Sequence, residues 1–304
     1  MQDFVSLLSR YRTYIMGVAM ICIMLFHQGW ITQPLGLFQL YGCHGVDIFF
    51  FVSGFGVYFS LQKHTLWDFY KRRIKRLLPL CIFCGGLKLG LFLTGYDIFY
   101  SEDMSILTLF GIDLWFLFDI WIFYLLSPLL LGLLKKHGII VMLCSFFIAI
   151  GGSVFMETPT FFRFGIVRIP VFLLGMMVAG GKLKISSREL SEGAIFVLLA
   201  FGYKLLSMEY HFLIETYRYL FFCGGACFVC YVLFHTAPFL QRIKAMKALE
   251  FVGRHSLELY LWHEYIYNCI YHLKLSPYLS FLVAFSLSII IAYCSSKIIK
   301  LVRL

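Results

Sequence analysis

Long apolar runs, separated by short polar segments, make up most of the chain. A run of about 17–25 apolar residues is long enough to cross the hydrocarbon core of a bilayer as a helix. The pattern predicts an all-α, polytopic transmembrane helical bundle with about ten spans, in which residues 1–304 form a single membrane-embedded domain. The predicted spans cover residues 13–30, 45–61, 77–95, 106–133, 138–156, 166–181, 192–208, 216–234, 255–273 and 277–299.

The composition agrees with a membrane protein. Hydrophobic residues make up 61% of the chain and charged residues 14%, whereas soluble domains carry about 25% charged residues. The ten cysteines include two pairs at CxxC spacing, Cys81/Cys84 and Cys227/Cys230. Both pairs lie in apolar runs, where cysteine serves as a small packing residue, so we expect no metal site.

The basic residues predict the orientation of the bundle. Most of the 26 Lys and Arg residues lie between spans on one side, and cytoplasmic loops of membrane proteins are enriched in these residues. Both termini are therefore predicted to be cytoplasmic, in a multi-pass protein integral to the cell membrane. The net charge of +10 follows from the same placement, so membrane lipid is an expected partner and nucleic acid is not.

Several ionisable residues lie within the predicted spans. His27 lies near the outer end of the first span, Asp47 opens the second, Asp113 lies in the outer half of the fourth, Arg168 is at the outer end of the sixth, and His263 is near the middle of the ninth. Such residues are costly in a bilayer and normally face a partner or a wet cavity. Their similar depth favours one outward cavity. A histidine in a span can simply bond a neighbouring helix, but imidazole also transfers protons near neutral pH.

The basic motif KRRIKR, Lys71 to Arg76, follows the second span. Arg73 and Arg76 are three residues apart and therefore share a helix face. Guanidinium groups match phosphate oxygens well, so the motif indicates an anion site. A simple topological anchor, or a patch for anionic lipid, produces the same pattern.

The pair Ser53-Gly54 interrupts the apolar second span. One interpretation is tight packing of another helix against small residues. The other is that the thin arm of a substrate passes close to the helix backbone at this point. The sequence leaves both open.

Five segments resemble, in the same order, the acyltransferase 3 family of integral-membrane O-acyltransferases. They are GVDIFFFVSGF, FYKRRIKRLLP, LWFLFDIWIFYLLSPLL, RIPVFLLGM and VGRHSLELYLWH. The resemblance spans nearly the whole chain. It implies transfer of an acyl group, usually acetyl, from cytoplasmic acyl-coenzyme A to a hydroxyl of a cell-surface or lipid-linked glycan. The donor would be a substrate, and no permanently bound cofactor is expected.

The resemblance also implies roles for individual residues. His27 matches the essential histidine of the family, and we expect it to be catalytic together with Asp47. Arg72, Arg73 and Arg76 are expected to bind the phosphates of the donor. The expected contacts to the acceptor or to the thioester carbonyl are Arg168, His263 and Asp113.

One position departs from the family pattern. An Arg or Lys eleven residues before the essential histidine is Met16 in this chain. Arg12 lies one turn earlier on nearly the same helix face, and one hypothesis is that it substitutes for the missing charge. The alternatives are that this member of the family is weakened or that it contacts the donor in a different way. Two other functions fit the same membrane-buried charges: a polytopic glycan or lipid transporter, and a catalytically silent relative that only binds glycan.

Overall fold

The computed structural model describes residues 4–27, 42–94, 109–110, 114–155, 164–181, 245–271 and 273–302, together with the single positions 232, 236 and 239. Every regular element in these ranges is a helix, which confirms the predicted all-α class. The predicted span 192–208, and the span 216–234 apart from position 232, lie outside the described residues, as do Asp113, Cys227 and Cys230.

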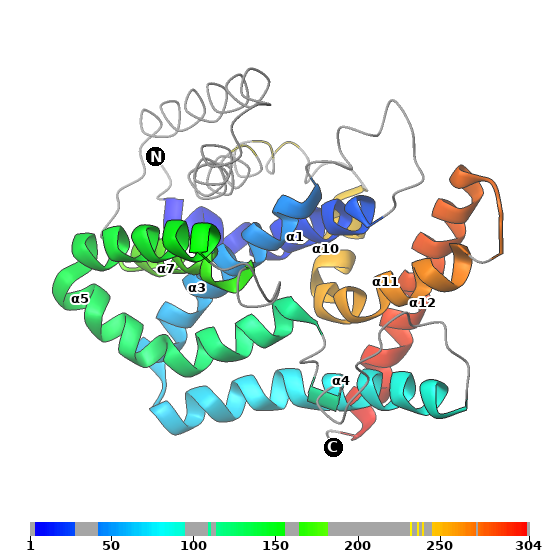
Figure 1. Ribbon diagram of the computed structural model, residues 1–304, viewed down its shortest axis with the longest axis horizontal. Coiled ribbons are helices and arrows are strands. Elements are labelled where there is room, and N and C mark those ends of the chain that lie inside the picture. The colour runs from blue at the N-terminus through cyan, green and yellow to red at the C-terminus, as the bar shows by residue number, and fades with distance from the viewer. Residues whose placement is uncertain are drawn as a thin grey trace.

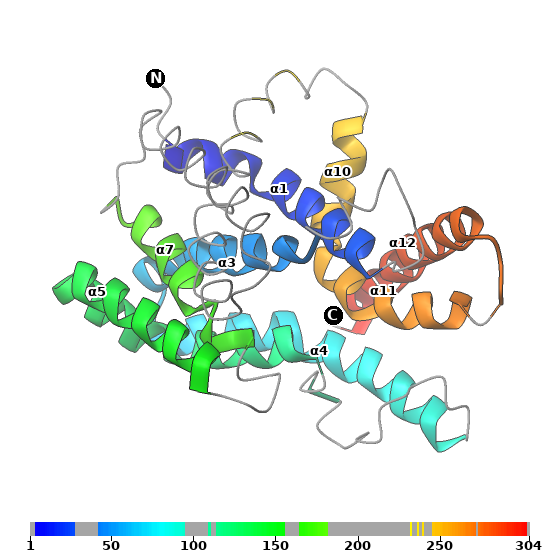
Figure 2. The same cartoon turned by 45° about the horizontal axis from the view of Figure 1, so that its top comes forward.

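The helices fold into an assembly in which α3 is central and α4 runs across one side (Figures 1 and 2). The elements are α1 (Phe4–Phe26), the short 3₁₀ helix η1 (Gly42–His44), α3 (Gly45–Lys63), α4 (Leu66–Leu93), α5 (Trp115–Phe155), α7 (Ile169–Ala179), α10 (Ala245–Arg254), α11 (Ser256–Tyr271) and α12 (Pro277–Val302).

Within the described residues, four helices are long and apolar enough to cross a membrane: Phe4–Phe26, Gly45–Lys63, Trp115–Ala149 and Pro277–Leu301. A shorter apolar helix covers Phe164–Ala179. Apolar helices of this length support a membrane protein. The full count of ten spans and the cytoplasmic position of the termini stay predictions.

The predicted break between the spans 106–133 and 138–156 is present, because α5 consists of two helices that meet in a kink at His137, with φ −135° and ψ 44°. One boundary differs from the predicted spans: α4 contains the basic motif as well as most of the third predicted span. Lys and Arg are good helix formers. The helix starts at Leu66 because the Thr65 hydroxyl accepts a hydrogen bond from the Asp68 backbone N–H (3.2 Å) and donates one to the Asp68 carboxylate (2.9 Å).

Glycines allow two close helix crossings. Helices α3 and α7 cross where Gly54 faces the carbonyl of Phe172 and Gly175 faces the carbonyl of Phe51, and a Cβ atom at either glycine would collide with backbone. Gly17 on α1 and Gly253 on α10 make the same kind of contact. Small residues let helix backbones approach in this way. The packing interpretation of Gly54 is therefore confirmed.

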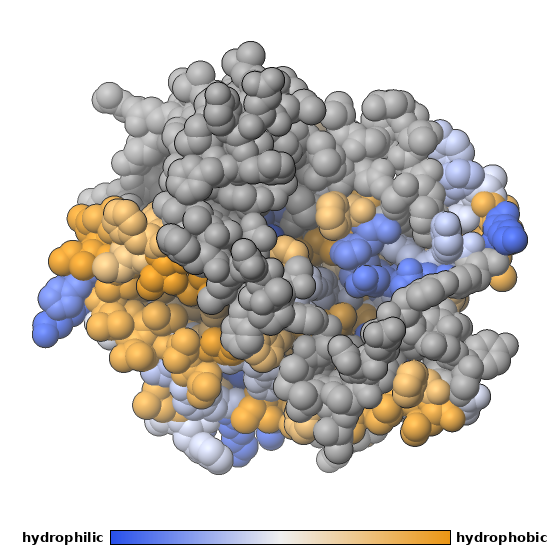
Figure 3. All heavy atoms as spheres, viewed as in Figure 1, coloured by the Kyte–Doolittle hydropathy of each residue, from blue (hydrophilic) through white to orange (hydrophobic). Residues whose placement is uncertain are grey.

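Aromatic rings fill the space around α3. The ring centroids of Phe50 and Phe116 are 5.0 Å apart, as are those of Phe123 and Phe172. The outward face of α5 is apolar as well, and Figure 3 shows hydrophobic residues gathered over this part of the molecule. Its exposed side chains include Leu125, Leu129, Ile139, Ile140, Leu143 and Phe147. A continuous exposed apolar surface of this kind suits contact with lipid.

Candidate active site

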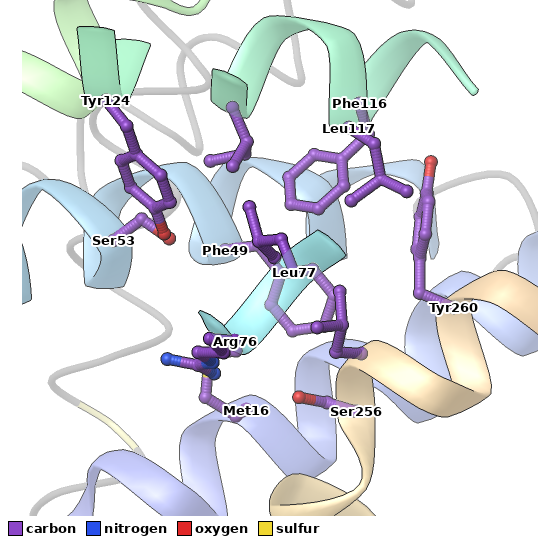
Figure 4. A pocket seen from close by; sticks show the side chains of 12 residues that line it. Met16, Phe49, Ser53, Arg76, Leu77, Phe116, Leu117, Tyr124, Ser256 and Tyr260 are labelled. Atoms are coloured by element: carbon purple, nitrogen blue, oxygen red, sulfur yellow. The ribbon is translucent and has the colours of Figure 1, made fainter. Parts of the chain in front are cut away.

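A pocket of about 430 Å³, including its open mouth, lies between α1, α3, α4, α5 and α11. Most of its wall is apolar, while Arg76, Ser53, Tyr124 and Ser256 contribute polar atoms (Figure 4). An apolar pocket with a few placed polar groups is typical of small-molecule sites. The lining residues are Met16, Phe49, Ser53, Arg76, Leu77, Phe116, Leu117, Ile120, Tyr124, Ser256, Leu257 and Tyr260.

Three guanidinium groups gather around one end of this pocket. The guanidinium carbon of Arg73 lies 4.7 Å from the centre of the Tyr124 ring and 5.2 Å from that of Phe69. Arg12 lies close enough to Arg73 and Arg76 for mutual electrostatic repulsion. Such a cluster is stabilised when an anion binds, because each positive charge then gains an opposite one.

Gly56 makes room for Arg12 in this cluster. Nη1 of Arg12 lies 3.1 Å from the place where a Cβ atom on Gly56 would be. Arg12 therefore rests against α3 near the pocket, one helical turn before Met16, which itself lines the pocket. Arg72 is exposed on α4 and is not one of the residues that line the pocket.

Ser53 and Gly54 point to different neighbours. The hydroxyl groups of Ser53 and Tyr124 share a hydrogen bond beside the arginine cluster, and Figure 4 shows the two side chains meeting. Gly54, as described above, contacts α7 instead. Of the two small residues in this span, Ser53 therefore lines the pocket and Gly54 allows the close packing of α7.

His27 and His263 are brought together beyond the opposite end of the pocket. The ring of Tyr260, a lining residue, is 5.6 Å from that of His263 between centroids. The His263 ring is in turn 5.0 Å from the ring of His27. His27 follows the last residue of α1, and its backbone N–H donates to the carbonyl of Ile23 (3.2 Å). A chain of ring contacts therefore leads from the pocket to His27.

Asp47 and Arg168 also meet. The buried carboxylate of Asp47 lies 2.8 Å from Nε of Arg168 and 3.2 Å from Nδ1 of His44. Arg168 also donates from Nη1 to the carbonyl of Phe164 (3.0 Å), and its guanidinium carbon lies 4.9 Å from the centre of the Trp115 ring. These interactions hold both charges of the buried pair, as such pairs require. The carboxylate contacts found among the described residues are thus with His44 and Arg168 rather than with His27.

Two residues of this region were not among the predicted site residues. His44 precedes Asp47 by three positions, a spacing that could have indicated the pair once a helix start was placed there. Asp119 is buried on α5 with its carboxylate against Gly165, within electrostatic range of Arg168. The sequence feature that could have identified Asp119 is an acidic residue inside a long apolar run.

Metal ligands do not gather in the part of the chain that the structure describes. No group of three or more His, Cys, Asp or Glu side chains there could hold a metal ion. Cys81 and Cys84, one of the CxxC pairs, are buried with free thiols in the core. Their environment is that of packing residues.

Comparison with known proteins adds the family. The sequence profile of the acyltransferase 3 family, described as an acyltransferase domain, matches residues 13–299. Curated relatives include the O-acetyltransferase OatA of Staphylococcus aureus strain COL and that of strain N315, each 26% identical over 283 residues, which covers 73% of this chain and 45% of the relative. The chain therefore spans about half the length of the curated relatives that it matches. No solved structure matches it.

The family match covers far more than half of the chain, and it includes every residue that lines the pocket. The chain therefore belongs to the acyltransferase 3 family of integral-membrane O-acyltransferases.

Proposed function

We propose that the chain is a membrane O-acyltransferase that moves an acyl group, most simply acetyl, from cytoplasmic acyl-coenzyme A to a hydroxyl of a cell-surface or lipid-linked glycan. Membership of the family and similarity to proteins named O-acetyltransferase support the reaction class. One observation carries the proposal: a pocket with an arginine cluster at one end and, past Tyr260, the pair His263 and His27 at the other.

The donor would enter at the arginine cluster. Arg73 and Arg76, joined by Arg12, would bind its phosphates, and the exposed Arg72 would add positive charge from the neighbouring turn. The narrow pantetheine arm suits the mostly apolar wall formed by residues such as Phe49, Leu77 and Leu117. The thioester would then approach Tyr260 and the histidine pair.

The acceptor hydroxyl would react at His27. A ring nitrogen of His27 takes the hydroxyl proton while the oxygen attacks the thioester carbonyl; the carbon–sulfur bond then breaks, and the coenzyme A thiolate leaves and takes up a proton. General-base help of this kind is worth about 10²–10⁴-fold, and placement of both substrates would supply much of the rest.

The polar residues near α7 would assist the transfer. Arg168, held by Asp47, is suited to stabilise negative charge that develops on the carbonyl oxygen or to hold the acceptor. Asp47 would then act through Arg168 and His44, with Asp113 as a further acceptor contact. Asp113 lies outside the described residues.

Transfer of label tests this function directly. Purified protein is incubated with labelled acetyl-coenzyme A and extracted surface glycans, and label in the glycan is measured. We expect transfer by the wild type and loss of transfer on His27→Ala, because no other group would take the proton. His137→Ala, an exposed histidine at the bend of α5, is the matched control and should transfer normally.

Two outcomes would contradict the proposal. Transfer by His27→Ala at the wild-type rate would remove His27 from the reaction. Absence of label transfer and of donor consumption in the wild type, with transport or binding of glycan instead, would favour a transporter or a silent glycan-binding protein.

A further inference from the structure

The hydrogen bonds of His263 determine which of its ring nitrogens carries a proton. Nδ1 lies 2.9 Å from the carbonyl oxygen of Tyr260 and 3.1 Å from that of Leu259. A carbonyl oxygen can only accept, so Nδ1 must be the protonated nitrogen. In the neutral imidazole, Nε2 then presents a lone pair and accepts hydrogen bonds. His263 therefore cannot donate to a thioester carbonyl through Nε2 while it is neutral.

This acceptor has no partner within the described residues. His263 is 1% exposed, and its Nε2 atom is buried without a hydrogen bond there. A buried polar atom without a partner is unfavourable and points to a function or to a missing ligand. The contacts of Nδ1 fix the ring against the preceding turn of α11, and the direction of Nε2 is therefore fixed as well.

Among the described residues, three rings contact His263, and that of His27 is the nearest of them between centroids, ahead of those of Tyr260 (5.6 Å) and Tyr267 (5.9 Å). The two ring centroids are 5.0 Å apart and the ring planes meet at 75°. Two imidazoles joined by an N–H···N hydrogen bond of about 2.9 Å have their centroids roughly 5 Å apart. The separation of the two rings therefore fits such a bond, which requires the His27 ring to turn so that an N–H faces Nε2 of His263.

We propose that His263 is a positioning residue for His27, whose ring N–H donates a hydrogen bond to Nε2 of His263. The proposal rests on the proposed role of His27 as the base. With one His27 nitrogen carrying the proton that His263 accepts, the other nitrogen keeps its lone pair for the acceptor hydroxyl. A base that is oriented by a third group is a recurrent arrangement in acyl-transfer sites.

Glu264, the next residue along α11, also lies within electrostatic range of His27. Glu264 is exposed. Water therefore competes for its carboxylate, which orients the His27 ring less firmly than the buried Nε2 of His263 does. Lys88 on α4 lies within electrostatic range of His263. An assay must therefore distinguish the effect of the acceptor nitrogen of His263 from the effect of the charges on Glu264 and Lys88.

Two amide substitutions make this separation. In His263→Gln the side-chain carbonyl can reach the former position of Nε2, whereas in His263→Asn it reaches only the level of Nδ1. We expect His263→Asn to lower kcat about 10- to 100-fold, as for loss of an orienting partner, with the KM for acyl-coenzyme A unchanged. His263→Gln should recover most of kcat, and Glu264→Gln should match the wild type.

Equal losses in the Asn and Gln variants, or a loss confined to Glu264→Gln, would overturn the proposal. A second measurement does not depend on transfer. Nitrogen-15 spectra of histidine-labelled protein should show His263, identified by its disappearance in His263→Gln, protonated at Nδ1, and its Nε2 resonance should move in His27→Ala.

If Nε2 of His263 carries the proton, or if its resonance is unchanged in His27→Ala, the proposed hydrogen bond does not exist, regardless of the transfer activity of the variants. If the spectra show the pair but the wild type transfers no acyl group, the proposed function fails and the pair stands.

Discussion

Arg12 and Met16 show how one residue position changes the chemistry at the pocket. Met16 lines the pocket where the family resemblance implies a positive charge, and Arg12 brings a guanidinium to the same arginine cluster from one turn earlier. The contact with Gly56 explains how a side chain as long as arginine fits there. That Arg12 replaces the missing charge in donor binding stays a prediction.

Exchanging the two residues tests this arrangement. Arg12→Met should raise the KM for acyl-coenzyme A by about 10-fold or more, since a hydrogen bond to a charged group contributes about 1.5–3 kcal/mol. The double variant Arg12→Met with Met16→Arg should bring the KM back toward the wild-type value. Arg10→Met, which removes an exposed arginine from the same helix, is the control, and steady-state kinetics on purified protein give the values.

An unchanged KM in Arg12→Met would exclude Arg12 from the donor site. Failure of the double variant, with Arg12→Met impaired, would mean that the position of the charge matters as well as its presence.

Helix crossings decide which side chains meet at the element scale. The spans predicted to begin at residues 45 and 277 do begin there, as α3 and α12. The hydrophobic pattern also divided α5 where the chain bends at His137, but it began the third span after the basic motif that belongs to the same helix. That start is too late because Lys and Arg interrupt an apolar run while remaining compatible with a helix.

The crossing of α3 and α7 supports the site, because α3 carries Asp47 and Ser53 while Arg168 immediately precedes α7. Gly175→Leu should destabilise the protein by about 1–3 kcal/mol or prevent folding, since the new side chain meets the backbone of α3. Gly132→Leu on α5, where a Cβ atom meets nothing within 4 Å, is the matched control. Thermal unfolding in detergent measures the difference, and equal melting temperatures would show that the crossing is not tightly packed.

At the scale of the whole molecule, the proposed reaction requires the two substrates to reach one pocket from opposite sides of a membrane. The arginine cluster would face the cytoplasm, and the histidine pair lies beyond the other end of the pocket. This polarity depends on the predicted orientation of the bundle, which follows from its basic loops.

Reporter fusions test the orientation. Green fluorescent protein fused at either terminus should fluoresce, and alkaline phosphatase fused at either terminus should be inactive, because both termini are expected in the cytoplasm. An active phosphatase at the C-terminus alone would mean an odd number of spans. An active phosphatase at both ends would place the arginine cluster outside and remove it as a donor site.

The sequence by itself determined the helical class, the family and the positions of several long apolar helices within the described residues. These follow from composition and from local periodicity, which depend only on neighbours along the chain. It also pointed to His27, Asp47, Arg168 and His263 as single residues.

Only the tertiary structure decided their partners. Asp47 pairs with Arg168, 121 positions away in the chain, and His27 meets His263 from α11. Side chains from distant segments meet only where helices cross, and the crossings depend on contacts such as Gly54 against Phe172, which no local pattern encodes. The accepting nitrogen of His263 likewise follows from the backbone carbonyls beside its ring, which only the folded chain places there.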